Sequence, residues 1–186
     1  RCGHTAGKAV VSREEAFTRI RAAVDARREG GFDIVLMART DARGTHSLDE
    51  AVARCKEFAR LGADITFLEA PQSVEEMETY CMEVPGPKMA NTVENGLTPV
   101  LLPEELDRMG YRLAAYPITL LSASIKAMEE ALLLLKCQTA SEESQTTAGE
   151  NATPSASLDN LLCDFDHVKD VVGFTGYYEE EARYKN

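Results

Sequence analysis

The sequence lacks a long apolar run, and positive charge is scarce. Its longest uninterrupted apolar stretch, residues 131–135, has five residues, whereas a membrane-spanning helix needs about 20. Lys and Arg number 20 against 31 Asp and Glu, which gives a net charge of −11 without any basic stripe. We therefore expect no membrane and no nucleic-acid partner. An acidic chain can still bind an anion in a locally basic pocket.

Cysteine and glycine-rich loops are also sparse. The five cysteines are scattered, with neither a metal-ligand spacing nor an even disulfide set. This pattern favours an intracellular, reducing compartment, such as the cytoplasm, a mitochondrion or a plastid. The chain begins at Arg1 without an initiator Met, so we expect a fragment or processed product whose targeting segment is out of view.

Strand and helix patterns alternate along the first 136 residues. Ser–x–x–Glu capping boxes begin helices at Ser12, Ser47 and Ser73, and Pro103 opens a fourth. Between them lie short apolar segments that are typical of buried strands, at residues 32–38, 65–68, 88–90 and 111–115, before a long helix at 118–136. Such alternation predicts an α/β fold with parallel strands and right-handed crossovers.

A polar residue follows most of these predicted strands. Arg39, Glu69 and Asn91 stand at three successive strand ends, which is the rim where (β/α)8 barrels carry their chemistry. Four units make half of such a barrel. A doubly wound open sheet is the rival fold, but no glycine-rich phosphate loop follows any strand. Taken singly, Arg39 could form a structural ion pair with Asp41, Glu69 could cap a turn, and Asn91 could be a turn residue.

The first residues, RCGHTAGK, carry the densest chemistry. Cys2, Gly3 and His4 lie between Arg1 and Lys8. Cationic neighbours lower the pKa of a thiol and make it reactive near neutrality. The segment is therefore a candidate catalytic loop, at residues 1–8, for an anionic substrate with Cys2 as proton donor or nucleophile. The alternative is an ordinary chain end with an incidental cysteine.

The composition changes after residue 136. Residues 137–157 are rich in Ser, Thr, Ala and Glu and lack periodicity, which predicts a flexible linker or insertion. Residues 158–186 become apolar and helical again, with Leu158, Leu161, Leu162 and Phe165 expected on one face. We expect this aromatic-rich end to dock on the half barrel (1–136) or on a second subunit.

Five motifs occur together in one order. They are RCGHTAGK at 1–8, MARTDA at 37–42, FLEAP at 67–71, MANTVENGLTP at 89–99 and GYRLAAYP at 110–117. With them, the chain resembles the isocitrate lyase/phosphoenolpyruvate mutase superfamily, in particular its methylisocitrate lyase and petal-death-protein-like branch. The resemblance extends to the terminal YYEEEARYKN and omits only residues 137–157.

The resemblance implies the C-terminal half of a (β/α)8 (TIM) barrel. Family members are usually tetramers that exchange their last helices, so we expect a homodimer or homotetramer with swapped C-terminal helices. The family's Mg²⁺ is held by aspartates of the first half of the barrel, so we expect Mg²⁺ as cofactor and no metal ligand in this chain.

The resemblance also implies the reaction. The chain is similar to Mg²⁺-dependent lyases that cleave a C–C bond of a 2-hydroxy di- or tricarboxylate, such as 2-methylisocitrate or dimethylmalate. Cys2 would be the general acid, and Gly3 and His4 would bind the carboxylate of the departing half. Arg39 would clamp a substrate carboxylate or the developing oxyanion. Glu69 would lie in the outer shell of the metal or orient residues of the loop. Asn91 would donate a hydrogen bond to a carboxylate.

Two alternatives remain open at this stage. Oxaloacetate hydrolases of the family typically have Ser where this chain has Pro117, the last residue expected at the substrate, and this difference favours the lyase. The second alternative is a catalytically incomplete half barrel. Its two unpaired strand edges would make it prone to aggregate or to dimerise.

Overall fold

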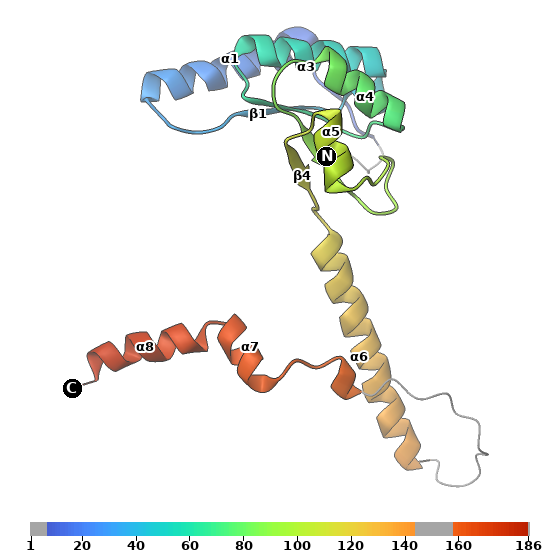
Figure 1. Cartoon of the computed structure of the whole chain (residues 1–186), viewed down its shortest axis with the longest axis vertical. Coiled ribbons are helices and arrows are strands. Elements are labelled where there is room, and N and C mark those ends of the chain that lie inside the picture. The colour runs from blue at the N-terminus through green and yellow to red at the C-terminus, as the bar shows by residue number, and fades with distance from the viewer. Residues whose placement is uncertain (1–6, 144–157, 186) are drawn as a thin grey trace. The chain divides into compact units, whose positions relative to one another are not determined.

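The computed structural model describes residues 7–143 and 158–185, with side chains described outside residues 137–143. The chain forms two compact units, Arg1–Leu120 and Leu121–Asn186. Figure 1 shows the helices and strands of both. The candidate site lies entirely in the first unit.

The first unit alternates helices and strands, as the sequence predicts. Its elements are, in order, α1 (Arg13–Gly30), β1 (Met37–Thr40), α2 (Ala42–Thr45), α3 (Leu48–Leu61), β2 (Ile65–Leu68), α4 (Val74–Glu83), β3 (Met89–Asn91), α5 (Pro103–Met109) and β4 (Leu113–Ala115). The sequence did not predict the short helix α2.

The strands run parallel in the order of the sequence. β1 pairs with β2, with Arg39 opposite Phe67, and β3 pairs with β4, with Asn91 opposite Ala115. A single bridge from Thr66 to Lys88 joins the two pairs. The carboxyl ends of all four strands therefore meet at one edge, as predicted for a parallel sheet.

Serine side chains begin three of the helices. Ser12, Ser47 and Ser73 accept hydrogen bonds from the backbone N–H three residues on, at 3.2, 3.1 and 3.3 Å. The glutamates expected to complete the capping boxes bind elsewhere, since Glu50 receives Arg13 and Arg54. Ion pairs thus take the place of the reciprocal half of the predicted motif, within one helix for Glu15 and Arg19 and between helices for Glu76 and Arg43.

The core lies between α3, α4 and the strands. Cys55, Met77 and Tyr80 are almost fully buried, and the Tyr80 hydroxyl lies 2.7 Å from the Thr66 hydroxyl of β2. Cys81 is half-buried against the same cluster. Figure 1 shows α1, α3 and α4 lying over β1.

The first predicted strand is only partly correct. Residues 32–36 are not a strand, and Phe32, Ile34 and Val35 are 64, 57 and 65% exposed rather than buried on both faces. The physical reason is pairing: β2 begins only at Ile65, which pairs with Met37, and the earlier residues meet no described strand. A strand ladder cannot form without a partner.

The described residues of the second unit form helices only. α6 (Thr119–Glu143) begins at the end of the first unit, followed by the 3₁₀ helix η1 (Leu158–Asn160), α7 (Phe165–Val171) and α8 (Phe174–Tyr184). α6 therefore continues seven residues into the segment expected to be a linker. Leu158 and Phe165 fall in separate helices, so the single face expected from residue 158 to 165 does not form. None of the described helices is long and apolar enough to cross a membrane.

An ion-pair cluster joins α1 to α3 and generates a test of the packing. Arg13 Nε lies 3.1 and 3.0 Å from the two Glu50 oxygens, and Arg54 Nε lies 2.7 Å from Oε1. Hydrogen bonds from Arg13, opposed by burial and joined by those from Arg54, lower the pKa of Glu50 from 4.5 to about 2.

We predict that Glu50→Gln lowers the free energy of unfolding by about 1–2 kcal/mol at pH 7, because it leaves buried Arg54 without its carboxylate. Since the folded pKa is depressed, this contribution is complete above pH 4.5 and disappears as the pH falls towards 2. Urea denaturation measures the effect. The matched control, Glu57→Gln, removes an exposed pair of the same helix with Arg60 and should lower the free energy of unfolding much less. Equal losses in both variants would contradict this account.

Candidate functional site

Arg39 lies on the open face of β1. Side chains alternate along a strand: Ala38 and Thr40 are buried, whereas the Arg39 side chain is 42% exposed. Its Nε and Nη2 lie 2.6 and 3.1 Å from the two carboxylate oxygens of Asp41. The guanidinium also stands 4.9 Å from the centre of the Phe67 ring. Arg39 is therefore fixed in orientation while remaining accessible.

Glu69 is the buried centre of the site. It directly follows β2 and is 2% exposed. One carboxylate oxygen lies 3.5 Å from Arg39 Nη2, and the other accepts a hydrogen bond of 3.3 Å from Asn91 Nδ2. Its backbone N–H donates to Thr40 O at 3.0 Å. A buried carboxylate needs such partners, and here they come from the neighbouring strands.

Three predicted site residues thus meet at one rim. Arg39, Glu69 and Asn91 come from the ends of β1, β2 and β3 and form one continuous network. The alternative ion pair between Arg39 and Asp41 also exists, but it belongs to the same network rather than replacing it. The sequence prediction of their proximity is therefore correct.

Asp41 and Lys8 also join this network, although the sequence analysis gave neither residue an individual role at the substrate. Asp41 pairs with both Arg39 and Lys8, and the side chains of Lys8 and Asp41 are only 12 and 15% exposed. Burial raises the pKa of Asp41, but the hydrogen bonds and charges of Arg39 and Lys8 outweigh it, so the pKa falls below its usual 3.8. Asp41 is therefore charged at neutral pH. The sequence had indicated Asp41 as a possible ion-pair partner of Arg39, but not its contact with Lys8.

The backbone next to Glu69 is strained. Ala70 has φ of 57°, in the left-handed region that non-glycine residues rarely adopt. Such conformations cost about 1 kcal/mol or more and persist where the surrounding structure requires them. Here the turn lies at the rim, directly after Glu69. Nothing in the sequence indicated it, because alanine is not a left-handed residue by preference.

Other candidates lie outside the contacts of this network. Pro117 is exposed two residues after β4, and no hydrogen bond or ion pair described for the network includes it. Glu94, on the loop after β3, accepts a 2.5 Å hydrogen bond from Thr119, while its Oε2 is buried without a hydrogen-bond partner among the described residues. Cys2, Gly3 and His4 lie outside the described residues.

The rim offers cationic and amide donors rather than a metal site. Lys8, Arg39 and Asp41 line a groove of about 250 Å³. Within residues 7–143 and 158–185, no group of three or more His, Cys, Asp and Glu residues is arranged to hold a metal ion. An exposed, oriented guanidinium suits a carboxylate, which it binds through two parallel hydrogen bonds.

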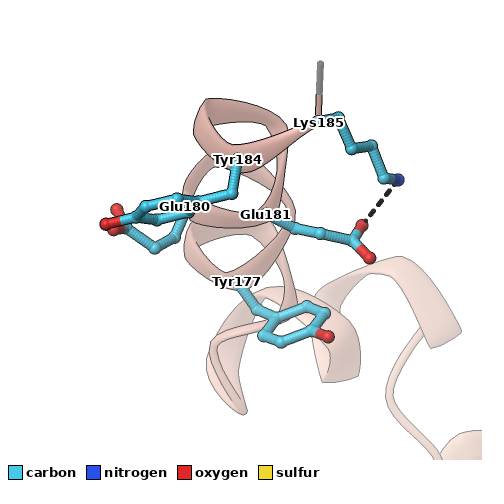
Figure 2. A pocket seen from close by; sticks show the side chains of 5 residues that line it. All are labelled: Tyr177, Glu180, Glu181, Tyr184 and Lys185. Atoms are coloured by element: carbon cyan, nitrogen blue, oxygen red, sulfur yellow. Dashed lines mark hydrogen bonds and ion pairs between the residues drawn. The ribbon is translucent and has the colours of Figure 1, made fainter.

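A groove on the second unit has a different character. Figure 2 shows Tyr177, Glu180 and Tyr184 of α8, with Glu181 paired to Lys185 at 2.8 Å. These residues come from a single helix and its end. Two acids and two aromatic rings around a shallow groove of about 380 Å³ offer no converging catalytic groups, so we keep the candidate site at the rim.

Comparison with known proteins identifies relatives. The phosphoenolpyruvate phosphomutase family model matches residues 3–135. The petal death protein of Dianthus caryophyllus is 36% identical over 186 residues, which cover 100% of this chain and 54% of that protein. The 2,3-dimethylmalate lyase of Eubacterium barkeri is 38% identical over 184 residues, covering 99% of this chain and 58% of the enzyme.

A solved structure gives the same result for the fold. Oxaloacetate acetylhydrolase in complex with 3,3-difluorooxalacetate superposes with a TM-score of 0.71 at 33% identity, over 95% of this chain and 57% of that one. The chain therefore spans a little over half the length of the relatives it matches.

We predict that Glu69→Gln lowers the free energy of unfolding by about 1–2 kcal/mol, because the amide turns an N–H group towards Arg39 or Asn91 inside a buried network. Chemical denaturation measures the loss. Glu83→Gln is the control, since Glu83 pairs with Lys56 where both side chains are nearly half exposed, and it should change stability by less than about 0.5 kcal/mol. A neutral Glu69→Gln would show that the network does not hold the strand ends together.

Proposed function

Because the chain belongs to the isocitrate lyase/phosphoenolpyruvate mutase superfamily, we propose that it carries the substrate-binding rim of a C–C bond lyase. The substrate would be a 2-hydroxy di- or tricarboxylate of the 2-methylisocitrate or dimethylmalate type. The observation that carries the proposal is the network of Arg39, Glu69 and Asn91, which brings one exposed guanidinium and one amide to the ends of successive parallel strands.

We propose that these strands are the second half of a (β/α)8 barrel. Four strands in sequence order leave β1 and β4 as edges, and each carries an apolar residue, Met37 or Leu113, that is 44% exposed. Phe32, Ile34 and Val35 are also exposed beside β1. Further barrel strands would cover this apolar surface, which a stable domain does not normally leave open.

The proposed reaction is a retro-aldol cleavage. A general base, which we place outside the described residues, accepts the hydroxyl proton of the substrate, the C–O bond of this carbon becomes the carbonyl of the keto acid, and the C–C bond breaks with its electron pair moving into the carboxylate half, which becomes an enolate. The Cys2 thiol then donates its proton to the enolate carbon and becomes a thiolate, and a 2-keto acid leaves as the second product. Gly3 and His4 would bind the carboxylate of the departing half.

The described residues would act by charge and orientation. Arg39 would hold a substrate carboxylate through paired hydrogen bonds and stabilise the charge that develops on it. Asn91 would donate to a carboxylate oxygen, while buried Glu69 orients both donors. Cys2 precedes Lys8 by six positions, and a segment of this length reaches at most about 21 Å at full extension, so the chain length allows Cys2 to approach the rim.

Mg²⁺ is part of the proposal as a cofactor of the complete enzyme. The described residues do not fit a magnesium site, so we propose that its ligands lie outside this chain, in the first half of the barrel. When bound, Mg²⁺ would stabilise negative charge on the substrate. This chain would also stabilise negative charge on the substrate, through Arg39.

We also propose that the chain forms a homodimer or homotetramer with exchanged C-terminal helices. Leu121, Ile125, Leu132 and Leu133 of α6 are between 44 and 65% exposed, and an apolar helix surface of this kind is normally covered by a partner. Localisation in an intracellular, reducing compartment stays a prediction.

Oxaloacetate hydrolysis is the second candidate function. The structural similarity to oxaloacetate acetylhydrolase favours it, whereas Pro117, where hydrolases of the family typically have Ser, favours the lyase. A catalytically incomplete half barrel is the third reading, and it predicts self-association of the isolated chain through the exposed edges of β1 and β4.

The products distinguish these candidates. We predict that a chimaera, with the N-terminal part of the Eubacterium barkeri 2,3-dimethylmalate lyase placed before Arg1, converts 2,3-dimethylmalate into pyruvate and propionate with added Mg²⁺. Product analysis by NMR measures this. Conversion of oxaloacetate into oxalate and acetate alone would favour the hydrolase, and a folded chimaera that turns over neither acid would contradict both.

We further predict that Arg39→Lys in an active chimaera lowers kcat/KM by 10²- to 10³-fold, because a single ammonium cannot replace the paired donors of a guanidinium. Steady-state kinetics measures the loss. Arg112→Lys, in an exposed pair with Asp107, is the matched control and should leave kcat/KM within twofold of the unmodified chimaera.

A further inference from the structure

Asp41 is the residue on which two cations of the rim converge. It follows β1 directly, and both of its carboxylate oxygens bind Arg39. Lys8 reaches the same carboxylate from the segment before α1. Asp41 precedes α2, yet its side chain makes no capping hydrogen bond to that helix among the described residues. Its carboxylate therefore serves the two cations rather than the local backbone.

The paired contact fixes the plane of the Arg39 guanidinium. A free arginine side chain has about 2 kcal/mol of rotamer entropy to lose on binding. Here Asp41 holds one edge of the guanidinium, Phe67 lies 4.9 Å from it, and Glu69 lies 3.5 Å from Nη2. A donor whose orientation is set before the ligand arrives binds more tightly, because the ordering cost has already been met.

The contact between Asp41 and Lys8 links Arg39 to the motif that contains Cys2. Lys8 is the last residue of RCGHTAGK, and its side chain is only 12% exposed. A charge that is this little exposed requires a partner, and the described partner is Asp41. The other charged groups that face this carboxylate are Arg39 and, beyond Arg39, Glu69.

We propose that Asp41 is a positioning residue that orients the Arg39 guanidinium and anchors the end of the 1–8 segment, through Lys8, at the same rim. The inference rests on the proposed function, since it assigns Asp41 a part in presenting Arg39 to a carboxylate. Asp41 itself does not touch the reacting atoms.

The first test uses the 186-residue chain and requires no activity. The Nε–H resonance of Arg39 is assigned in ¹H–¹⁵N spectra by its disappearance in Arg39→Lys, and its hydrogen exchange with solvent is measured. We expect Asp41→Ala to accelerate this exchange at least 10-fold, or to broaden the resonance beyond detection. Asp107→Ala, which removes the exposed partner of Arg112, should leave Arg39 unchanged.

Lys8 provides an independent readout in the same variants. Acetylation by an N-hydroxysuccinimide ester, followed by mass spectrometry, reports how accessible and mobile its ammonium is. We expect at least a threefold faster reaction of Lys8 in Asp41→Ala and no change in Asp107→Ala. Unchanged exchange at Arg39 together with unchanged acetylation of Lys8, in a variant with a native circular dichroism spectrum, would overturn the proposal.

Asp41→Asn covers the case in which Asp41→Ala does not fold. It keeps one acceptor oxygen and the side-chain volume, so we expect a smaller acceleration at Arg39, of about threefold, and its absence would count against the proposal. In an active chimaera, Asp41→Asn should lower kcat/KM mainly through a higher KM. An inactive chimaera would reject the proposed function, whereas the exchange data would still decide the role of Asp41.

Discussion

The rim depends on one buried carboxylate. Glu69 is almost inaccessible to water, and it is stable there only because Arg39 and Asn91 approach it from the two neighbouring strands. Removing either partner would leave charge in a poorly solvated place. The need to neutralise Glu69 therefore fixes the relative positions of three strand ends, and this arrangement places a guanidinium and an amide side by side where a ligand can reach them.

The charges around Glu69 continue along the rim. Arg39 lies between Glu69 and Asp41, and Asp41 in turn lies between Arg39 and Lys8. Acid and base alternate along this line, so no cation is wholly neutralised by a single acid. The two acids and two cations of this line sum to zero net charge, so the arrangement orients the Arg39 guanidinium towards a ligand without giving the rim an excess of positive charge.

Much of this arrangement was predictable from the sequence. The parallel order follows from alternating strand and helix patterns, and it brings Arg39, Glu69 and Asn91 to one edge. The helix starts at Ser12, Ser47 and Ser73 were also predictable, because a serine side chain accepts a hydrogen bond from a backbone N–H of the first helical turn, which has no partner within the helix.

The remaining features depend on contacts between distant residues. The sequence indicated Asp41 as a possible partner of Arg39, but nothing local in it indicated the contact between Asp41 and Lys8. The left-handed turn at Ala70 is imposed by its surroundings. Apolar residues 32–36 match a buried strand in composition, yet pairing decides strand formation, and β2 does not extend to them.

The central claim is that this rim binds a substrate carboxylate through Arg39. A crystal structure of the chimaera with 3,3-difluorooxalacetate, the inhibitor bound in the oxaloacetate acetylhydrolase structure, tests it most directly. The account predicts an inhibitor carboxylate within hydrogen-bond distance of the Arg39 guanidinium, with the Asn91 amide beside it and Glu69 still bound to both. An inhibitor bound away from this rim, with Arg39 contacting only Asp41 and Glu69, would contradict the claim.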